Sequence, residues 1–500
     1  MNLLRLMKNC LAHIWMWTAI SKIKKICLLL IFLILCAAAY NFFRGNPEGT
    51  EYRSSEYFIS PADIEFLYDL TFKDTSGKII SDQKIFDRIF YLIDRAEKYI
   101  LIDMFLFNSY TGSEDHSHRN LSYELVQHLV DKKRDCPGIK IDFITDPINT
   151  VYGGANSKEV GLLKAAGINV ILTDLHKLRD SNVLYSPFWR IFFQWFGNSR
   201  DGFLPNPFSG KEEGVSLRSY LELLNFKANH RKIFVSDYGN TLKSVVTSAN
   251  PHDGSSAHSN VAFEITGDFG DELIKAESAV TEFSGASLSS AHIYSKNETV
   301  KDKNKSCSVI LLTENRIEEA LLENMNMSRQ GDKIDMGMFY LSDRDIVNAL
   351  INAAGRGVDI RLILDPNKDA FGRQKNGIPN RQTACELIEK SKGRIKIRWY
   401  DTHGEQYHSK ITLIENRGNP SVVILGSANL TRRNLENYNL ELDVFYSAPQ
   451  DDRTIMKVEQ YFNKIWNGSS YASDYSTYKD DSSFKKLYAR FLEFTGASTF

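Results

Sequence analysis

An internal duplication constrains the fold of this 500-residue chain more strongly than any other feature. Five segments of the N-terminal half recur in the same order in the C-terminal half. The matching segments are Tyr99–Phe107 with Lys333–Leu341, Ile139–Pro147 with Val358–Pro366, Asn229–Asp237 with Tyr407–Glu415, Val245–Asn250 with Val423–Asn429, and Asn260–Ile265 with Asn439–Val444. Two copies are too few for a solenoid. We therefore expect two similar lobes facing each other across a pseudo-two-fold axis, so that equivalent residues can meet at one site.

Each copy has the pattern of an α/β lobe. In the first copy the helical periodicity of Gln83–Tyr99 leads into the strand-like Tyr99–Phe107. In the second copy Ile317–Met327 leads likewise into Lys333–Leu341. Alternation of amphipathic helices with short apolar runs predicts α/β layers around a largely buried sheet.

The length suits this division, because single hydrophobic cores stop growing at about 250–300 residues. We place the first lobe at residues 46–300 and the second at residues 301–500. The charged run Lys301–Lys305 is interpreted as a solvated linker between them.

The N-terminal segment, residues 1–45, predicts a membrane anchor. Ile26–Phe43 is apolar except for Asn41, and three lysines precede it within Ser21–Lys25. A helix of about 18–20 apolar residues matches the hydrocarbon thickness of a bilayer, and upstream positive charge favours a cytoplasmic N-terminus. We expect a single-pass protein of a bacterial-type cell membrane, with a short cytoplasmic tail and the body outside the cytoplasm.

Two other interpretations of this segment stay open. A signal peptide could be cleaved after Ala37–Ala39, which would release a secreted protein. A lipoprotein site at Cys36 is the weaker alternative, because Leu35 stands where a small residue is preferred.

Composition limits the possible partners and cofactors. The chain has 61 Lys and Arg against 62 Asp and Glu, a formal net charge of −1, so no global positive field attracts a polyanion. The six cysteines include no CxxC pair or metal-type spacing. Nucleic acid is therefore disfavoured as a partner, and no metal ion or other cofactor is expected.

The first half carries an insertion, residues 175–225, that the second half lacks. Its middle, Tyr185–Phe208, is dense in aromatic residues. Such a stretch can pack into the core of its own lobe. It can equally form an apolar wall or lid against acyl chains or the bilayer interface. Only the exposure of its side chains separates these interpretations.

Two His-x-Lys motifs occupy equivalent places in the duplication. His230-Arg231-Lys232 is followed by Asp237, and His408-Ser409-Lys410 is followed by Glu415. In a strand, side chains two residues apart point to the same face, so each His emerges beside its Lys. A single motif of this kind is weak, but two in matching positions indicate a shared site.

This combination of side chains suits attack on phosphorus. A neutral imidazole can be the nucleophile while the neighbouring ammonium neutralises the charge on the non-bridging oxygens. A second His–Lys pair opposite supplies a general acid for the leaving alkoxide. A metal ion is then unnecessary.

Further candidates follow each motif at similar distances, and they comprise hydroxyl, amide and carboxylate groups. They are Ser248 and Asn250 with Ser427 and Asn429, and then Glu264 with Glu441. The serines and asparagines can donate hydrogen bonds to phosphate oxygens. Each glutamate can hold an imidazole Nδ1–H and stabilise the charged ring. We expect Asp237 and Glu415 to brace the fold rather than to react.

The residues quoted resemble the phospholipase D superfamily, which is marked by HxKxxxxD and a following Gly/Ser-Ser/Gly-Asn element, normally twice. The resemblance extends in layout from Tyr57 to Phe462 and implies two α/β/α sandwich lobes. It also implies a ping-pong mechanism through a covalent phosphohistidine on His230, with His408 as acid and then base. Lys232 and Lys410 would hold the phosphate together with the two asparagines, and the two glutamates would stand behind the imidazoles.

The sequence departs from the family pattern at two points. Glu415 replaces the usual Asp, and Thr247-Ser248-Ala249-Asn250 stands where Gly-Ser-Ala-Asn is usual. Neither change removes a group that the chemistry needs.

Three functions are compatible with these features. The anchor, the aromatic insertion and the balanced charge favour hydrolysis of glycerophospholipids, or transfer of their phosphatidyl group from a phospholipid substrate to water or an alcohol. The Asn-His-Arg-Lys form of the first motif also resembles bacterial cardiolipin synthases. The alternatives are an exported nuclease of the same superfamily, which would need a local basic groove, and a non-catalytic membrane-tethered binding module.

Overall fold

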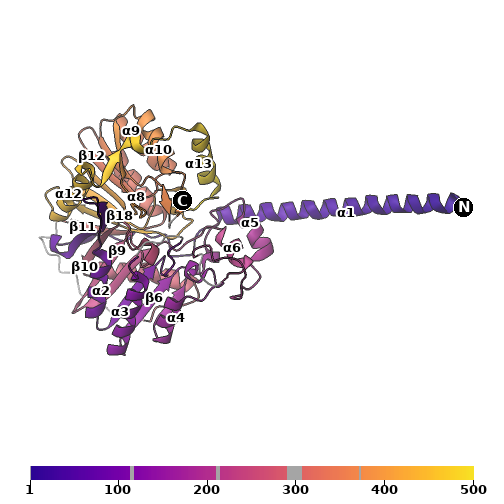
Figure 1. Ribbon diagram of the computed structural model, residues 1–500, viewed down its shortest axis with the longest axis horizontal. Coiled ribbons are helices and arrows are strands. Elements are labelled where there is room, and N and C mark those ends of the chain that lie inside the picture. Colours follow the sequence, from indigo (N-terminus) through magenta and orange to yellow (C-terminus); the bar gives the residue numbers. More distant parts are fainter. Residues whose placement is uncertain (1, 113–117, 210–213, 290–306, 371–372) are drawn as a thin grey trace.

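The computed structural model describes residues 2–112, 118–209, 214–289, 307–370 and 373–500. A long N-terminal helix, α1 (Asn2–Phe43), projects from a body that contains two large β-sheets (Figure 1). The run Lys301–Lys305, predicted to be a linker, lies outside the described residues.

The first large sheet has seven strands drawn from the N-terminal half. In spatial order they are β2 (Ile64–Tyr68), β10 (Val261–Thr266), β9 (Thr241–Thr247), β8 (Lys232–Tyr238), β5 (Tyr99–Met104), β6 (Lys140–Thr145) and β7 (Asn169–Leu172). β5, β6 and β7 are parallel, whereas β8 runs antiparallel to β5. Strand β8 begins at Lys232 of the first motif.

The second large sheet has nine strands. They are β1 (Tyr57–Ile59), β11 (Cys307–Thr313), β19 (Leu442–Ala448), β18 (Ser421–Gly426), β17 (Lys410–Glu415), β12 (Lys333–Met338), β13 (Asp359–Leu364), β16 (Ile395–Tyr400) and β20 (Ala472–Asp474). From β11 to β16 the order and directions repeat those of the first sheet, with β17 in the place of β8 and β12 in the place of β5. The predicted α/β class is confirmed.

Helices cover one face of each sheet, and a shared core fills the space between the sheets. The covering helices are α2 (Ile85–Arg95), α3 (Leu121–Asp135) and α4 (Lys158–Ala165) on the first sheet, and α8 (Asn315–Met327), α9 (Arg344–Gly355) and α10 (Asn380–Lys390) on the second. The shared core includes α7 (Phe269–Phe283) and α12 (Arg453–Asn467). Val246 of β9 and Leu425 of β18 belong to this one core, so the two sheets pack as one body.

Shorter elements complete the described chain. They are the hairpins β3 (Leu70–Lys73)–β4 (Ile79–Asp82) and β14 (Asp369–Ala370)–β15 (Arg373–Gln374), the single turns η1 (Pro61–Asp63), η2 (Pro147–Thr150), η3 (Leu175–Lys177), η5 (Asp253–Ser255) and η6 (Tyr475–Tyr478), and the helices α5 (Ser186–Phe188), η4 (Trp189–Phe193), α6 (Leu217–Leu223), α11 (Arg432–Leu435) and α13 (Ser483–Thr495). Of these, α5, η4 and α6 form the insertion, and α13 lies close to the C-terminus.

Helix α1 contains one stretch that is long and apolar enough to cross a bilayer. Ser21–Phe43 contains an 18-residue window with a mean hydropathy of 2.6, of which only 6% is buried. Its 23 residues extend about 34 Å at about 1.5 Å per residue, close to the thickness of a hydrocarbon core. The predicted segment Ile26–Phe43 lies within it and fits a membrane anchor.

The aromatic insertion is divided between core and surface. Trp189 is buried beneath the guanidinium of Arg218, which lies 4.3 Å from the ring centroid. Trp195, Phe196 and Phe203 are 74%, 65% and 86% exposed. The insertion therefore packs on its own lobe through one side and presents aromatic rings to the outside through the other.

Candidate active site

The two His-x-Lys motifs lie where the two halves of the chain meet. His230 precedes β8, and its backbone N–H donates to the carbonyl of Leu440 in the other half at 2.9 Å. His408 precedes β17, and its N–H donates to the carbonyl of Ser259 at 2.9 Å. Each motif is thus fixed by the opposite half at an equivalent point.

Buried carboxylates hold the residue before each histidine. Asp146 Oδ2 accepts from the N–H of Asn229 at 2.8 Å, and Asp365 Oδ2 accepts from the N–H of Tyr407 at 2.8 Å. These aspartates directly follow the repeated strands β6 and β13 and were not singled out from the sequence. Their recurrence as Asp-Pro in both halves was the signal for this role.

The first imidazole has a carboxylate partner from the other half. His230 Nδ1 lies 2.9 Å and 3.0 Å from the two oxygens of Glu441, which is fully buried. The ring of Phe105 packs edge-on against His230 at 4.8 Å between centroids, and the ammonium of Lys232 lies 5.1 Å from the Phe105 centroid. This places Glu441 where the sequence analysis expected a carboxylate.

The second imidazole repeats the geometry with a different partner. His408 Nδ1 lies 3.0 Å from the carbonyl oxygen of Ser248 and 3.2 Å from Oδ1 of Asn260. Phe339 packs against His408 at 4.9 Å, and Lys410 lies 5.2 Å from the Phe339 centroid. Phe105 and Phe339 were not singled out from the sequence, although they stand at matching positions of the repeat, one residue after β5 and β12.

Both rings have the same tautomer when neutral. The groups facing Nδ1 of His230 and His408 are acceptor oxygens, so each Nδ1 carries the proton and each Nε2 carries the lone pair. A ring in this state can attack through Nε2 or, once protonated there, donate from it.

Asn260, and not Glu264, is the counterpart of Glu441. Ser427 Oγ donates to Glu441, and Ser248 Oγ donates to Asn260 Oδ1 at 3.0 Å. In both halves the residue after this partner donates its backbone N–H to the same serine. Leu442 N–H donates to Ser427 Oγ at 3.0 Å, and Val261 N–H donates to Ser248 Oγ at 3.1 Å. The sequence paired Asn260–Ile265 with Asn439–Val444, whereas the hydrogen bonds make Asn260 equivalent to Glu441. The alignment of the two halves is therefore shifted by two residues.

The prediction that Glu264 holds an imidazole is wrong. Its carboxylate accepts from Arg88 at 2.5 Å and 2.8 Å and from Lys243 at 2.9 Å. It follows Asn260 by four residues, which is about 13 Å along a strand. Distance in sequence failed here because the segments that separate Ser248 from Asn260 and Ser427 from Glu441 differ in length.

The predicted serines and asparagines differ in burial and in hydrogen bonding. Ser248 and Ser427 are fully buried, so their hydroxyls position the groups behind the imidazoles and do not reach a phosphate; this corrects the prediction that they bind substrate. Asn250 Oδ1 accepts from the N–H of Leu106 at 3.2 Å. Oδ1 of Asn429 is buried and has no hydrogen-bond partner among the described residues.

The two motif acids contact structural groups. Asp237 accepts from three successive backbone amides, those of Glu97, Lys98 and Tyr99, at 2.8–3.2 Å. Glu415 forms an ion pair with Lys333 at 2.8 Å. Neither carboxylate contacts an imidazole of the motifs.

Burial and mutual repulsion set the charge state of the site. Burial, with the nearby ammonium groups of Lys232 and Lys410, holds the pKa of His230 well below its usual range. Burial and then Lys410 do the same to the pKa of His408, with smaller contributions from His258, Lys232 and His230. All four side chains of the two motifs therefore act on one another electrostatically, and the rings are neutral at neutral pH.

Burial shifts the pKa values of the two motif lysines and of Glu441 in opposite directions. Burial lowers the pKa of Lys232 to about 7 and lowers that of Lys410 well below its usual range. Burial also raises the pKa of Glu441 to about 7. A bound phosphate would restore the charge of the two ammonium groups, because an anion between them offsets both the desolvation and the repulsion.

Arg231, at the middle position of the first motif, is a structural group that the sequence analysis did not single out. It is fully buried, donates to Glu314 at 2.8 Å and to Glu277 at 3.3 Å, and also donates to the carbonyl of Thr50 at 3.2 Å. These contacts tie the first motif to elements of both halves. Within the described residues, no group of three or more His, Cys, Asp or Glu side chains could hold a metal ion.

Comparison with known proteins identifies part of the chain by sequence. Residues 321–466 match the family described as "Cardiolipin synthase, PLD-like domain". This stretch runs from α8 to α12 and contains the second motif. A search of curated proteins found no match.

Solved structures resemble the chain in fold. Phosphatidylserine synthase from Haemophilus influenzae Rd KW20 aligns with a TM-score of 0.53 at 13% identity, over 88% of this chain and 95% of that one. Polyphosphate kinase from Porphyromonas gingivalis aligns at 0.44 with 14% identity, over 87% and 53%, and Nuc from Salmonella typhimurium at 0.26 with 20% identity, over 34% and 97%. The first alignment covers nearly the whole of both chains and shows a shared fold.

Proposed function

We propose that the chain is a member of the phospholipase D superfamily and an enzyme of phospholipid metabolism, a membrane-anchored phosphodiesterase or phosphatidyltransferase that acts on glycerophospholipids; the family match of residues 321–466 and the shared fold support this. The observation that carries this proposal is the equivalent placement of two His–Lys pairs at the junction of the two halves. Each imidazole is oriented through Nδ1 by a group of the opposite half, which leaves Nε2 as the nitrogen that would act on a substrate.

In the first half-reaction His230 is the nucleophile. Its Nε2 lone pair attacks phosphorus, and the bond from phosphorus to the leaving alcohol oxygen breaks. His408, protonated at Nε2 when the anionic substrate binds, transfers that proton to the leaving oxygen. The product is a phosphohistidine whose positive ring is stabilised by Glu441 at Nδ1.

In the second half-reaction His408 acts as the base. It takes a proton from water or from an alcohol, whose oxygen attacks phosphorus as the phosphorus–nitrogen bond breaks. Hydrolysis gives phosphatidic acid, and transfer to an alcohol gives a new phosphodiester. Lys232, Lys410, Asn250 and Asn429 hold the non-bridging oxygens through both steps.

Several features support a lipid substrate. The matched family is described by the name of cardiolipin synthase, and the similar structure is that of a phosphatidylserine synthase. Helix α1 fits a membrane anchor and contacts α5 (Figure 1) and η4 of the insertion, which carry the exposed rings of Phe188 and Phe192. With the N-terminus in the cytoplasm, the body of this single-pass protein lies on the outer side of the membrane.

The proposal is tested by incubating the purified full-length protein with labelled phosphatidylglycerol and phosphatidylcholine, and in parallel with single-stranded DNA. We expect phosphatidic acid or cardiolipin from the lipids and intact DNA. Cleavage of DNA without turnover of either lipid would overturn the lipid assignment. The variant H230A serves as control, and lipid turnover that persists in this variant would contradict the proposed nucleophile.

A further inference from the structure

Helix α13 presents an apolar stripe that faces away from the body. The stripe comprises Phe484, Leu487, Tyr488, Phe491 and Phe494, which recur at the spacing of one helical face. Phe484, Leu487 and Phe494 are 77%, 69% and 73% exposed. The opposite side carries Ala489 and Glu493, both buried.

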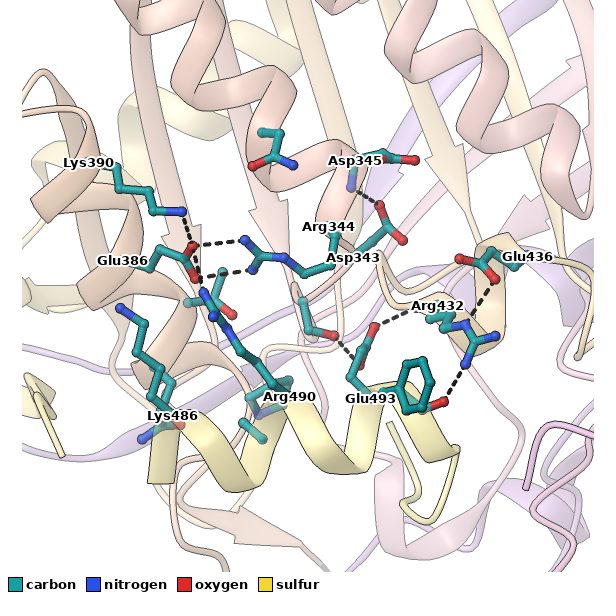
Figure 2. A pocket seen from close by; sticks show the side chains of 17 residues that line it. Asp343, Arg344, Asp345, Glu386, Lys390, Arg432, Glu436, Lys486, Arg490 and Glu493 are labelled. Carbon is teal, nitrogen blue, oxygen red and sulfur yellow. Dashed lines mark hydrogen bonds and ion pairs between the residues drawn. The ribbon is translucent and has the colours of Figure 1, made fainter. Parts of the chain in front are cut away.

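Polar contacts fix the orientation of α13 (Figure 2). Glu493 accepts from Ser342 Oγ at 2.7 Å and from the N–H of Arg432 at 2.7 Å. Arg490 pairs at 3.1 Å with Glu386 of α10, which also binds Arg344 at 2.8 Å. The polar side of α13 is therefore committed to Ser342, α10 and α11, and the apolar stripe faces outward. Of its rings, Phe494 lies beneath the guanidinium of Arg432, 5.9 Å from the ring centroid.

The stripe continues a second exposed apolar surface at the base of α1. Val183, just before α5, donates its N–H to the carbonyl of Thr495 at the end of α13 at 3.1 Å. Beyond it the insertion exposes Phe188, Phe192, Trp195 and Phe196. Helix α1 contacts both α5 and η4, and α13 lies on the same side of the body as α1 (Figure 1).

The end of α1 is held firmly against this surface. Arg179 donates to the carbonyl of Phe42 at 2.8 Å, and Asn46 Nδ2 donates to the carbonyl of Asn437 at 2.9 Å. The apolar stretch Ser21–Phe43 therefore leaves the body beside the exposed rings. A bilayer crossed by α1 would have its surface at this side of the body.

We propose that α13 and the exposed rings of α5, η4 and the turn that follows η4 form a membrane-docking surface that lies in the interfacial layer of the bilayer crossed by α1. Phe and Trp rings partition well into that layer. Buried on its other side, Ala489 packs in one cluster with Phe339 beside His408, so docking places the catalytic half directly against the lipid surface.

The proposal rests on the membrane span proposed above and not on the catalytic reaction. It is tested with L487C, F196C and Y123C variants of the full-length protein, each labelled with a polarity-sensitive fluorophore. Tyr123 is also half-exposed but lies on α3, which packs on the far face of the first sheet. The labelled proteins are placed in vesicles of phosphatidylethanolamine and phosphatidylglycerol with and without a lipid-borne quencher, and labelled wild type gives the contribution of the native cysteines.

We expect the labels at positions 487 and 196 to be quenched at least about twofold more than the label at position 123. A variant that keeps Cys36 of α1 as its only cysteine reports the span independently. Quenching at Cys36 with equal quenching at 487 and 123 would overturn the docking surface while leaving the span intact. A label at 487 that is shielded without being quenched, in a protein that sediments as two chains, would assign the stripe to a second copy and would equally overturn the proposal.

Discussion

The two halves differ at the group behind each imidazole. The carboxylate of Glu441 faces Nδ1 of His230, whereas the neutral amide oxygen of Asn260 faces Nδ1 of His408. A carboxylate stabilises the positive ring that forms when a phosphorus–nitrogen bond is made. This asymmetry agrees with His230 as the nucleophile and His408 as the proton carrier.

The substitution Glu441→Gln separates this role from a general electrostatic effect. We expect kcat to fall by about a hundredfold to ten-thousandfold, because the amide cannot stabilise the charged ring and can present its N–H to Nδ1. Glu264→Gln is the matched control, since that carboxylate pairs with Arg88 and Lys243 away from the imidazoles. Steady-state kinetics should show near-normal kcat for the control; equal losses would contradict the assignment.

The pH dependence of kcat/KM follows from two groups of the free enzyme. The pKa of Glu441 is raised to about 7, so activity should rise with pH as this carboxylate ionises. The pKa of Lys232 is lowered to about 7, so activity should fall as the ammonium is lost above that pH. We expect a narrow maximum near neutral pH. In Lys232→Arg the part of the alkaline fall that belongs to Lys232 should disappear, because guanidinium stays charged, whereas Lys410, whose pKa is also lowered, still titrates. A profile identical to that of the wild type would argue against this origin.

At the scale of elements, the motif acid Asp237 fixes the turn before β5. Its carboxylate accepts from three backbone amides, and its removal leaves buried donors unsatisfied. We expect Asp237→Ala to lower the free energy of unfolding by at least about 2 kcal/mol. Glu415→Ala should cost less, since that ion pair with Lys333 is partly exposed. Urea unfolding of the two variants measures the difference, and equal losses would refute it.

The strands and the motifs could be predicted from the sequence because buried strands keep the same apolar pattern in both halves. The strand order, in which β8 and β17 take the same place in their sheets, follows from that repeat. The partner of His408 could not be predicted, because Asn260 becomes equivalent to Glu441 only through hydrogen bonds from Ser248 and Ser427. The role of Arg231 could not be predicted, because nothing in the sequence shows that this residue is buried. The exposure of the α13 stripe could not be predicted either, because its apolar spacing is the same as that of a helix packed on a core.

For the whole molecule, Arg231 is a central connection between the halves. Arg231, Glu277 and Glu314 have no exposed side-chain surface, so removing the cation leaves two buried carboxylates without their partner. We expect Arg231→Met to destabilise the protein by about 3–5 kcal/mol. Arg316→Met, which breaks only exposed ion pairs, should cost less than about 1 kcal/mol. Thermal unfolding compares the two, and similar midpoints would contradict a structural role for Arg231.

Each half of the chain supplies the groups that orient the imidazole of the other half. His230 depends on Glu441 for its orientation, and His408 depends on Ser248 and Asn260 for its own. We therefore propose that both imidazoles act on a single phosphorus atom, with His230 forming the covalent bond.

Trapping of the intermediate tests this claim most directly. The variant His408→Ala is incubated with bis(p-nitrophenyl) phosphate, whose leaving group needs no acid, and the digested protein is analysed by mass spectrometry. The account predicts a burst of p-nitrophenol and a stable p-nitrophenyl phosphate adduct on His230. An adduct on another residue, or release of p-nitrophenol by His230→Ala at the wild-type rate, would contradict it.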